Sequence, residues 1–266
     1  MSFNETLKAL IKSKKSHLCI GLDVDKSKLP QSVLSSDDPI LTFNQQIIKY
    51  TEDIAVVYKL NLAFYEALGE KGYRIMKDTL SMIPKDILTI ADAKRGDIGN
   101  SSSKYAEAVF DDLGFDAVTV NPYMGFDSVE PFCINPEKGV FILVLTSNKG
   151  SSDFQQIESA NGIPFFLEVA RKITDWNGND NIGMVLGATH PEELESAVKE
   201  APKLSVLIPG VGKQGGEGNR VKNIFKDNDQ APFIVNSSRG IIYASSGEDY
   251  AVKAREVAKE LRDELN

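Results

Sequence analysis

Short apolar runs alternate with longer amphipathic stretches along the chain. The runs are rich in residues that favour strands, whereas the stretches between them repeat their apolar residues at helical spacing. Eight runs predict strands, at residues 18–22, 54–59, 87–92, 117–121, 140–145, 182–186, 205–208 and 233–236. The intervening pattern predicts helices, among them residues 62–82, 100–113, 164–174, 191–200, 221–227 and 248–265. Strands that alternate with helices pair in parallel through right-handed crossovers.

Eight consecutive βα units predict a closed (β/α)8 TIM barrel in preference to an open doubly wound sheet. We interpret residues 1–266 as one domain, because no internal repeat, low-complexity tract or linker rich in proline and serine divides the chain. Two longer irregular segments, 24–38 and 147–162, interrupt the pattern. Segments of this length are usually either functional lids or mobile connections. The second follows the fifth strand, which would place it at the active face.

The composition narrows the classes of ligand. Hydrophobic residues make up 42% of the chain and charged residues 26%, as is ordinary for a globular protein, and the formal net charge is −8. An acidic chain has no general affinity for nucleic acid or for an acidic membrane surface. A ligand that carries phosphate would therefore need local groups, such as glycine-rich loops and single arginines.

Cysteine and histidine are scarce. Cys19 and Cys133 lie in or near apolar runs, so we expect buried free thiols and a reducing cytoplasmic compartment. Residues 1–17 alternate at helical spacing, without the continuous apolar core of a signal peptide, and no run approaches the roughly 18 apolar residues of a membrane span. Only His17 and His190 could serve a zinc site or a catalytic triad, and we interpret both as structural.

The strongest chemical signal is the stretch ADAKRGDIGN, residues 91–100. Asp92 and Lys94 are two apart at the end of a predicted strand, so they should project from the same face, while Asp97 lies in the following loop. Ionisable groups crowded in this way perturb one another's titration, as reactive sites require. The alternative is a solvated charge run, which these residues alone do not exclude.

Other predicted strands also end in polar residues. In a TIM barrel the reactive residues gather at the carboxyl ends of the strands. The residues at these ends are Asp23 after the first strand, Lys59 after the second, Thr146 and Ser147 after the fifth, Pro209 and Gly210 after the seventh, and Ser237, Ser238 and Arg239 after the eighth. Charged groups at the ends of three adjacent strands favour a common site over scattered surface residues.

The loop PGVGKQGGEGN, residues 209–219, contains Gly210, Gly212 and Gly215 in the spacing G-x-G-x-x-G. That spacing marks a dinucleotide site only in the first βα turn, and here it follows the seventh strand. We interpret it instead as a loop whose backbone N–H groups receive a phosphate, with Arg239 adding charge-assisted hydrogen bonds. A flexible glycine turn without a ligand is the alternative.

These motifs resemble those of the orotidine 5'-monophosphate decarboxylases, in particular a longer bacterial subgroup. The matching segments follow the family's order and span nearly the whole barrel: GLDVD at 21–25, YKLN at 58–61, DAKRGDIGNS at 92–101, LTSNKGS at 145–151, PGVGKQGG at 209–216 and NSSRGI at 236–241. The D-x-K-x-x-D element is shared with a wider superfamily. The lysine after the second strand and the Pro-Gly-Val-Gly-x-Gln-Gly-Gly loop narrow the resemblance to this family.

The resemblance implies a catalytic role for four residues. Lys59, Asp92, Lys94 and Asp97 would form an alternating charge network, in which Lys94 donates the proton that replaces the departing carboxyl group. Asp92 would lie against that carboxylate. Asp97 would reach across a homodimer interface into the neighbouring site. The reaction would need neither a metal nor a cofactor.

The resemblance also implies how orotidine 5'-monophosphate is held. The substrate-binding residues would be Asp23, Lys59, Ile98, Ser101, Ser147, Pro209, Gln214 and Arg239, and the phosphate loop would comprise Gly212, Gln214, Gly215 and Arg239. Two positions depart from the common pattern, because Ser101 stands where many members have threonine and Ser238 where many have glycine.

Two rival functions remain open. A magnesium-dependent sugar-phosphate aldolase or decarboxylase of the same superfamily shares D-x-K-x-x-D, but places an acidic metal ligand where this chain has Lys59, a poor companion for a divalent cation. The other rival is a phosphate-binding barrel without catalysis. Binding of UMP without turnover would favour it.

Overall fold

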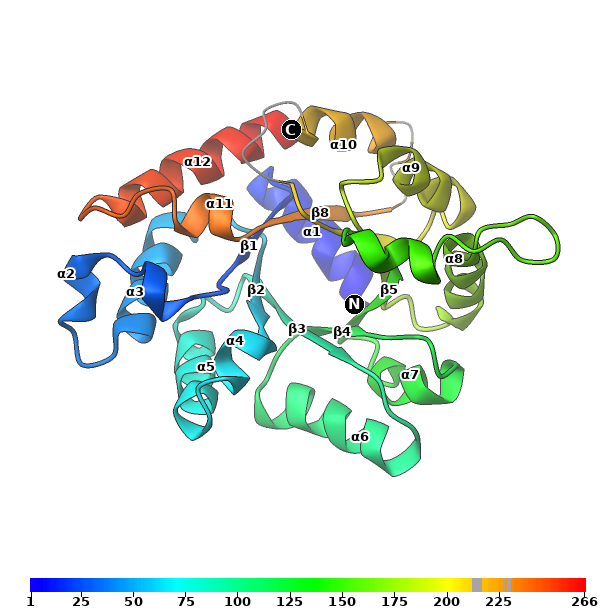
Figure 1. Cartoon of the computed structure of the whole chain (residues 1–266), viewed down its shortest axis with the longest axis horizontal. Helices are drawn as coiled ribbons and strands as arrows, with labels where there is room; N and C mark the ends of the chain where they lie inside the picture. Colours follow the sequence, from blue (N-terminus) through cyan, green and yellow to red (C-terminus); the bar gives the residue numbers. More distant parts are fainter. Residues whose placement is uncertain (212–216, 227, 229–230) are drawn as a thin grey trace.

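Eight parallel strands close into a barrel in the computed structural model, which describes residues 1–211, 217–226, 228 and 231–266 (Figure 1). The order is sequential, and β1 pairs with β8 to complete the ring. The strands are β1 Leu18–Gly21, β2 Val57–Asn61, β3 Leu88–Arg95, β4 Ala117–Val120, β5 Gly139–Leu145, β6 Ile182–Leu186, β7 Ser205–Pro209 and β8 Phe233–Ser237. The predicted (β/α)8 barrel is confirmed.

Helices surround the barrel and connect successive strands. They are α1 Phe3–Lys14, α2 Gln31–Leu34, α3 Pro39–Thr51, α4 Leu62–Glu66, α5 Glu70–Met82, α6 Gly99–Glu107, α7 Phe126–Cys133, α8 Phe165–Trp176, α9 Pro191–Glu200, α10 Glu217–Phe225, α11 Arg239–Ile242 and α12 Tyr250–Leu265. Among the described residues, no helix is both long and apolar enough to cross a membrane.

The single helix predicted over residues 62–82 is wrong, because it is two helices, α4 and α5. Gly69 lies between them with φ +63°, a conformation that glycine adopts without the strain of a side chain. A Cβ on Gly72 would lie 1.8 Å from the carbonyl oxygen of Tyr65, so glycine there lets α5 start close against α4.

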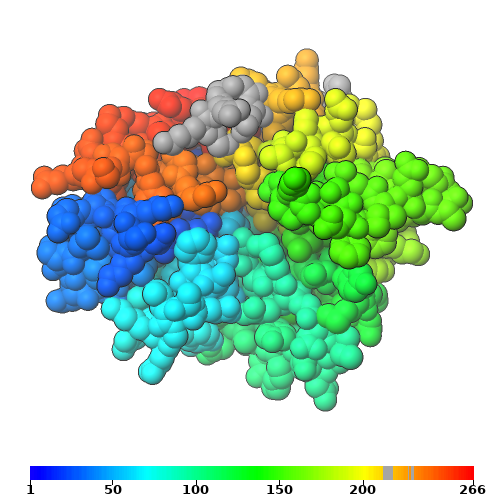
Figure 2. All heavy atoms as spheres, viewed as in Figure 1, coloured from blue at the N-terminus to red at the C-terminus, as the bar shows by residue number. Residues whose placement is uncertain are grey.

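The two irregular segments carry short helical turns. η1, Lys26–Lys28, and α2 lie within 24–38, and η3, Lys149–Asp153, lies within 147–162. Figure 2 shows the segment after β5, in green, on the face toward the viewer. Its first residues, Ser147 and Asn148, line pockets at the carboxyl ends of the strands, the face at which the segment was predicted.

The barrel interior changes from apolar to charged along the strands. Phe3 and Leu7 of α1 close the amino-terminal end, and the ring of Phe3 meets that of Phe141 edge-on at 5.9 Å. The apolar layer packed on α1 consists of Cys19, Val57, Ile90, Ala117, Phe141, Val185, Leu207 and Ile234. Two residues further along β2, β3 and β4 come Lys59, Asp92 and Thr119. Since alternate residues share a face, these polar side chains form the next layer, at the barrel mouth.

The residues interpreted as structural have structural contacts. Cys19 and Cys133 are free and buried. The ring of His17 stacks on Phe233 at 3.9 Å, and its Nδ1 lies 2.9 Å from the carbonyl oxygen of the same residue. His190 precedes α9.

Candidate active site

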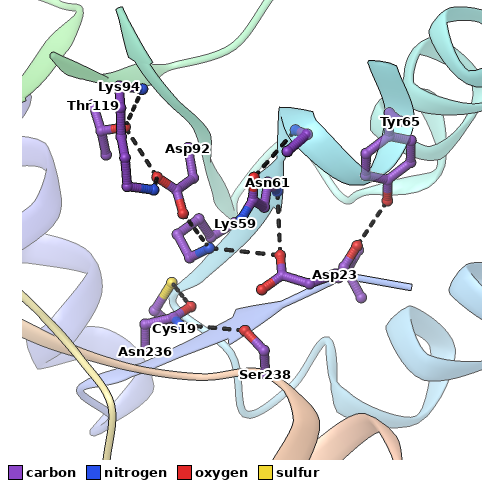
Figure 3. Close-up of polar contacts among 12 residues, drawn as sticks. Cys19, Asp23, Lys59, Asn61, Tyr65, Asp92, Lys94, Thr119, Asn236 and Ser238 are labelled. Carbon is purple, nitrogen blue, oxygen red and sulfur yellow. Dashed lines mark hydrogen bonds and ion pairs between the residues drawn. The ribbon is translucent and has the colours of Figure 1, made fainter. Parts of the chain in front are cut away.

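Asp92 is the centre of a compact polar cluster at the carboxyl ends of β2, β3 and β4 (Figure 3). Its Oδ2 accepts a hydrogen bond from Lys59 Nζ at 2.9 Å. Its Oδ1 accepts from Lys94 Nζ at 2.5 Å and from Thr119 Oγ1 at 3.1 Å. The carboxylate is therefore fixed from three sides, which holds its charge and its orientation before any ligand binds.

Lys94 reaches this cluster through an irregular backbone. The pairing of β3 with β4 shifts register between Ala91 and Arg95, and Lys94 itself has φ +46°. Asp92 and Lys94 meet as predicted, although the strand is bulged where they lie. About half of the Lys94 side chain is exposed, so its ammonium group is open to the pocket.

Lys59 is the buried member of the cluster. Only 4% of its side chain is exposed, and its Nζ lies 2.9 Å from Asp92 and 3.6 Å from Asp23. Asp23 is in turn held by the backbone N–H of Asn61 at 3.2 Å. The first three strands thus supply an alternating row of carboxylate, ammonium, carboxylate and ammonium: Asp23, Lys59, Asp92 and Lys94.

The row sets the charge state of its buried members. Burial alone would lower the pKa of Lys59, but the charges of Asp23 and Asp92 outweigh it and raise that pKa above its usual value. Burial would raise the pKa of Asp92, but Lys59 and Lys94 outweigh it and lower that pKa to about 2. Both groups are therefore charged throughout the physiological range.

The depressed pKa of Asp92 predicts how stability depends on pH. A carboxylate with a lowered folded-state pKa stabilises the fold above its unfolded pKa, and this contribution is lost as the pH falls through the folded value. The shift from 3.8 to about 2 corresponds to about 2 kcal/mol. We expect the difference in unfolding free energy between wild type and Asp92→Asn, measured in urea, to shrink by that amount between about pH 5 and pH 2.

The matched control for that measurement is Asp86→Asn. Asp86 also pairs with a lysine, Lys14, but 71% of its side chain is exposed. Its removal should change the pH dependence of stability much less. Equal pH dependence in the two variants would contradict the depressed pKa of Asp92.

Two adjoining pockets open at the barrel mouth and share Ser147. One, of about 330 Å³, has Lys59, Asp92 and Lys94 on one side and an apolar wall on the other; the wall comprises Leu143, Val185, Leu207 and Pro209. The other, of about 610 Å³, is lined by Asp23, Lys28, Ser147, Gly210, Val211, Asn236, Ser237, Ser238, Arg239, Gly240 and Tyr243. The first pocket therefore combines charged side chains with an apolar wall, and the second contains the cationic side chains of Lys28 and Arg239.

Three predicted site residues lie apart from these pockets. Asp97, Ile98 and Ser101 sit in and just after the turn between β3 and α6, and none of them lines either pocket. Within the described part of the chain, Asp97 makes no hydrogen bond or ion pair to Lys59, Asp92 or Lys94; its Oδ1 accepts from the backbone N–H of Ile98 at 2.8 Å. Gly212, Gln214 and Gly215, predicted for the phosphate loop, lie outside the described residues.

Ser238, the unusual residue beside Arg239, is accommodated by Gly21. A Cβ on Gly21 would lie 1.8 Å from Ser238 Oγ, so the hydroxyl occupies space that only glycine leaves empty. Asn236 Nδ2 donates a hydrogen bond to the same oxygen at 3.3 Å. The Ser238 side chain therefore lies beside Gly21 of β1, in space that a side chain at position 21 would fill.

Sequence reasoning assigned no role to Thr119, Asn236 or Lys28. Thr119 could have been noticed, because it is a polar residue at an inward position of the apolar strand AVTV. Asn236 lies within a recognised motif, and its Oδ1 lies 3.4 Å from Cys19 Sγ. Lys28 gave no signal, because its η1 turn belongs to a segment without periodicity.

An alternating row of lysines and aspartates at the carboxyl-terminal mouth of the barrel, where such barrels carry their active sites, indicates an enzyme of the (β/α)8 class. Comparison with known proteins narrows this class. A model of the "Orotidine 5'-phosphate decarboxylase / HUMPS family" matches residues 16–254, so the chain belongs to that family. The predicted family is confirmed.

Individual relatives agree with the family match. The chain is 48% identical over 270 residues to the orotidine 5'-phosphate decarboxylase of Dehalococcoides mccartyi, covering 100% of this chain and 98% of that protein. It is 49% identical over 258 residues to that of Parabacteroides distasonis, covering 96% and 92%. The structure of the Leishmania donovani OMP decarboxylase superposes with a TM-score of 0.82 at 32% identity, covering 100% of this chain and 99% of the other.

Proposed function

We propose that the protein decarboxylates orotidine 5'-monophosphate to UMP, the last step of de novo UMP synthesis, without a metal or an organic cofactor. The observation that carries this proposal is the fixed row of Asp23, Lys59, Asp92 and Lys94 at the mouth of the barrel. Membership of the family and the relatives' names support the substrate.

Loss of carbon dioxide from the pyrimidine ring needs a fixed positive charge beside the reacting carbon. When the bond between the pyrimidine ring and the carboxyl group breaks, its electron pair stays on a ring carbon that no carbonyl group can readily delocalise. A preorganised ammonium group stabilises such a carbanion, and it costs no reorganisation at the moment of reaction. Lys94, held by Asp92 and half exposed to the pocket, supplies that charge and then transfers its proton to the same carbon.

Asp92 has a second role in this proposal. It would lie against the substrate carboxylate, so that loss of carbon dioxide relieves the repulsion between the two anions. Since such ground-state destabilisation is a contested mechanism, we rank it below the stabilisation of the carbanion. Lys59 holds Asp92 charged and in place throughout.

The two pockets divide the substrate between them. The pyrimidine ring occupies the smaller pocket against Pro209, with Ser147 at the junction, while Asp23 and Lys59 hold the ribose hydroxyls. The phosphate lies beside Arg239 in the larger pocket, and Gly212, Gln214 and Gly215 are proposed to bind it as well. Phosphate binding, remote from the reacting carbon, would then support the chemical step through loop closure.

This division predicts a strong dependence on the phosphate. Two or three charge-assisted hydrogen bonds of about 1.5–3 kcal/mol each are lost with orotidine, so its kcat/KM should be at least about 10²-fold below that of orotidine 5'-monophosphate. Steady-state absorbance assays on both compounds measure this ratio. Comparable values for the two would refute the proposed phosphate pocket.

We further propose that the active unit is a homodimer in which Asp97 and Ile98 complete the neighbouring site. Their absence from the pockets of their own chain supports this, and so does the apolar surface beside them. Ile98 is 58% exposed and Tyr123 80%. Met124, 43% exposed, lies between β4 and α7, and its Cε would be 3.4 Å from a Cβ on Gly96, which directly precedes Asp97. Large exposed apolar side chains close to Asp97 fit a protein interface.

The magnesium-dependent rival fits the site less well. A divalent cation there would need an acidic ligand from β2, and the side chain at that place is the ammonium group of Lys59, already between Asp23 and Asp92. Those two carboxylates are neutralised by protein charge, so a cation would have to displace Lys59 to reach them.

A further inference from the structure

Thr119 connects the two residues that the proposed mechanism depends on. Its Oγ1 donates a hydrogen bond to Asp92 Oδ1 at 3.1 Å, and the same oxygen accepts one from the backbone N–H of Lys94 at 2.9 Å (Figure 3). The residue is 1% exposed and is the last but one of β4. One hydroxyl therefore fixes both the carboxylate and the backbone of the lysine that approaches it.

The backbone at Lys94 needs such a partner. β3 advances four residues from Ala91 to Arg95 while β4 advances two, from Val118 to Val120, so the ladder between the strands is interrupted there. Lys94 lies in the left-handed region with φ +46°, which costs a residue with a side chain roughly 1–2 kcal/mol. The hydroxyl of Thr119 provides the acceptor that the interrupted ladder does not offer to the Lys94 N–H group.

We propose that Thr119 is a positioning residue for the decarboxylation: it holds the β3 bulge in the shape that places the Lys94 ammonium group over Asp92. This inference rests on the proposed function of Lys94. Thr119 is not itself a catalytic residue. The hydroxyl donates its single proton to Asp92 and accepts a hydrogen bond from the Lys94 N–H group. It therefore has no proton left to donate to a substrate.

The test compares Thr119→Val with Thr119→Ser. Valine keeps the shape but leaves the Lys94 N–H without its acceptor and removes one donor from Asp92, whereas serine keeps the hydroxyl. Since small displacements of catalytic groups can cost 10²-fold in rate, we expect kcat to fall about 10²-fold in the valine variant. KM should change little, and serine should restore kcat to within a few-fold of wild type.

Thr89→Val is a matched control. Thr89, also on β3, has a hydroxyl that donates to Asp116 Oδ2 at 2.8 Å and accepts from the Asp116 N–H at 3.1 Å. It has the same double role but lines neither pocket at the barrel mouth. This variant should lose thermal stability as Thr119→Val does, and keep its kcat.

A second readout separates this inference from the proposed function. Hydrogen exchange at the Lys94 amide should be slow in wild type and in Thr119→Ser, and faster in Thr119→Val, whatever reaction the protein catalyses. If the wild-type protein shows no turnover, the proposed function is refuted. The exchange rates at Lys94 then still test whether Thr119 holds the β3 bulge. The inference is overturned if the valine variant keeps near-normal kcat in an active enzyme, if serine is equally defective, or if exchange at Lys94 is unchanged.

Discussion

Lys94→Ala is expected to abolish the loss of orotidine 5'-monophosphate absorbance while leaving the fold intact by circular dichroism. The variant removes the proposed proton donor, which is also the proposed fixed charge beside the ring carbon. General acid catalysis contributes about 10²–10⁴-fold and electrostatic stabilisation about 10²–10³-fold. We therefore expect kcat to fall by about 10⁴-fold or more. Lys59 still pairs with Asp92 in this variant, which keeps the buried carboxylate satisfied.

The control for Lys94→Ala is Lys104→Ala. Lys104 lies on α6, with 75% of its side chain exposed and an ion pair to Glu107. It carries the same charge but lines neither pocket at the barrel mouth, so its removal should leave turnover unchanged. Near-normal turnover by Lys94→Ala would refute the assignment of Lys94 as the proton donor.

Two inactive variants are expected to restore activity when their subunits are exchanged. If Asp97 serves the neighbouring site, a hybrid of Lys94→Ala with Asp97→Asn contains one site with both residues intact. Random pairing in a twofold dimer then gives about a quarter of wild-type activity per subunit. The assay mixes the two proteins under conditions that exchange subunits and measures turnover against each variant alone.

A second pair of variants tests which residues belong to the same subunit's active site. In the proposed mechanism Asp92 and Lys94 act within one chain, so mixing Asp92→Asn with Lys94→Ala leaves a defect in every site and should restore nothing. Recovery in this second mixture, or none in the first, would contradict the division between the subunits. So would full activity in a demonstrably monomeric variant, because a monomer should fold and still be inactive.

Most of the row of charges was predictable from strand geometry. The carboxyl ends of neighbouring strands meet at one mouth, which brings Asp23, Lys59 and Asp92 together. Regular alternation also predicted that Lys94 lies beside Asp92; the two side chains do meet, but through the bulge at Lys94. The eight strands were predictable from their apolar runs. Their number and their alternation with helices define the barrel without any knowledge of long-range contacts.

The departures from regularity were not predictable. The bulge at Lys94 depends on a partner 25 residues further along the chain, the hydroxyl of Thr119, so no local pattern signals it. The break at Gly69 is hidden because apolar spacing continues across it from α4 into α5. The role proposed for Asp97 depends on a second subunit, which the periodicity of one chain cannot describe.

The most direct test of the whole account is to follow orotidine 5'-monophosphate absorbance with the purified protein in the presence of a chelator. We expect the absorbance to decay with formation of UMP at the rate seen without chelator. Activity that disappears in chelator and returns with magnesium would support the metal-dependent rival. Binding of UMP with no decay at all would show a phosphate-binding barrel, and would contradict the role given to Asp92 and Lys94.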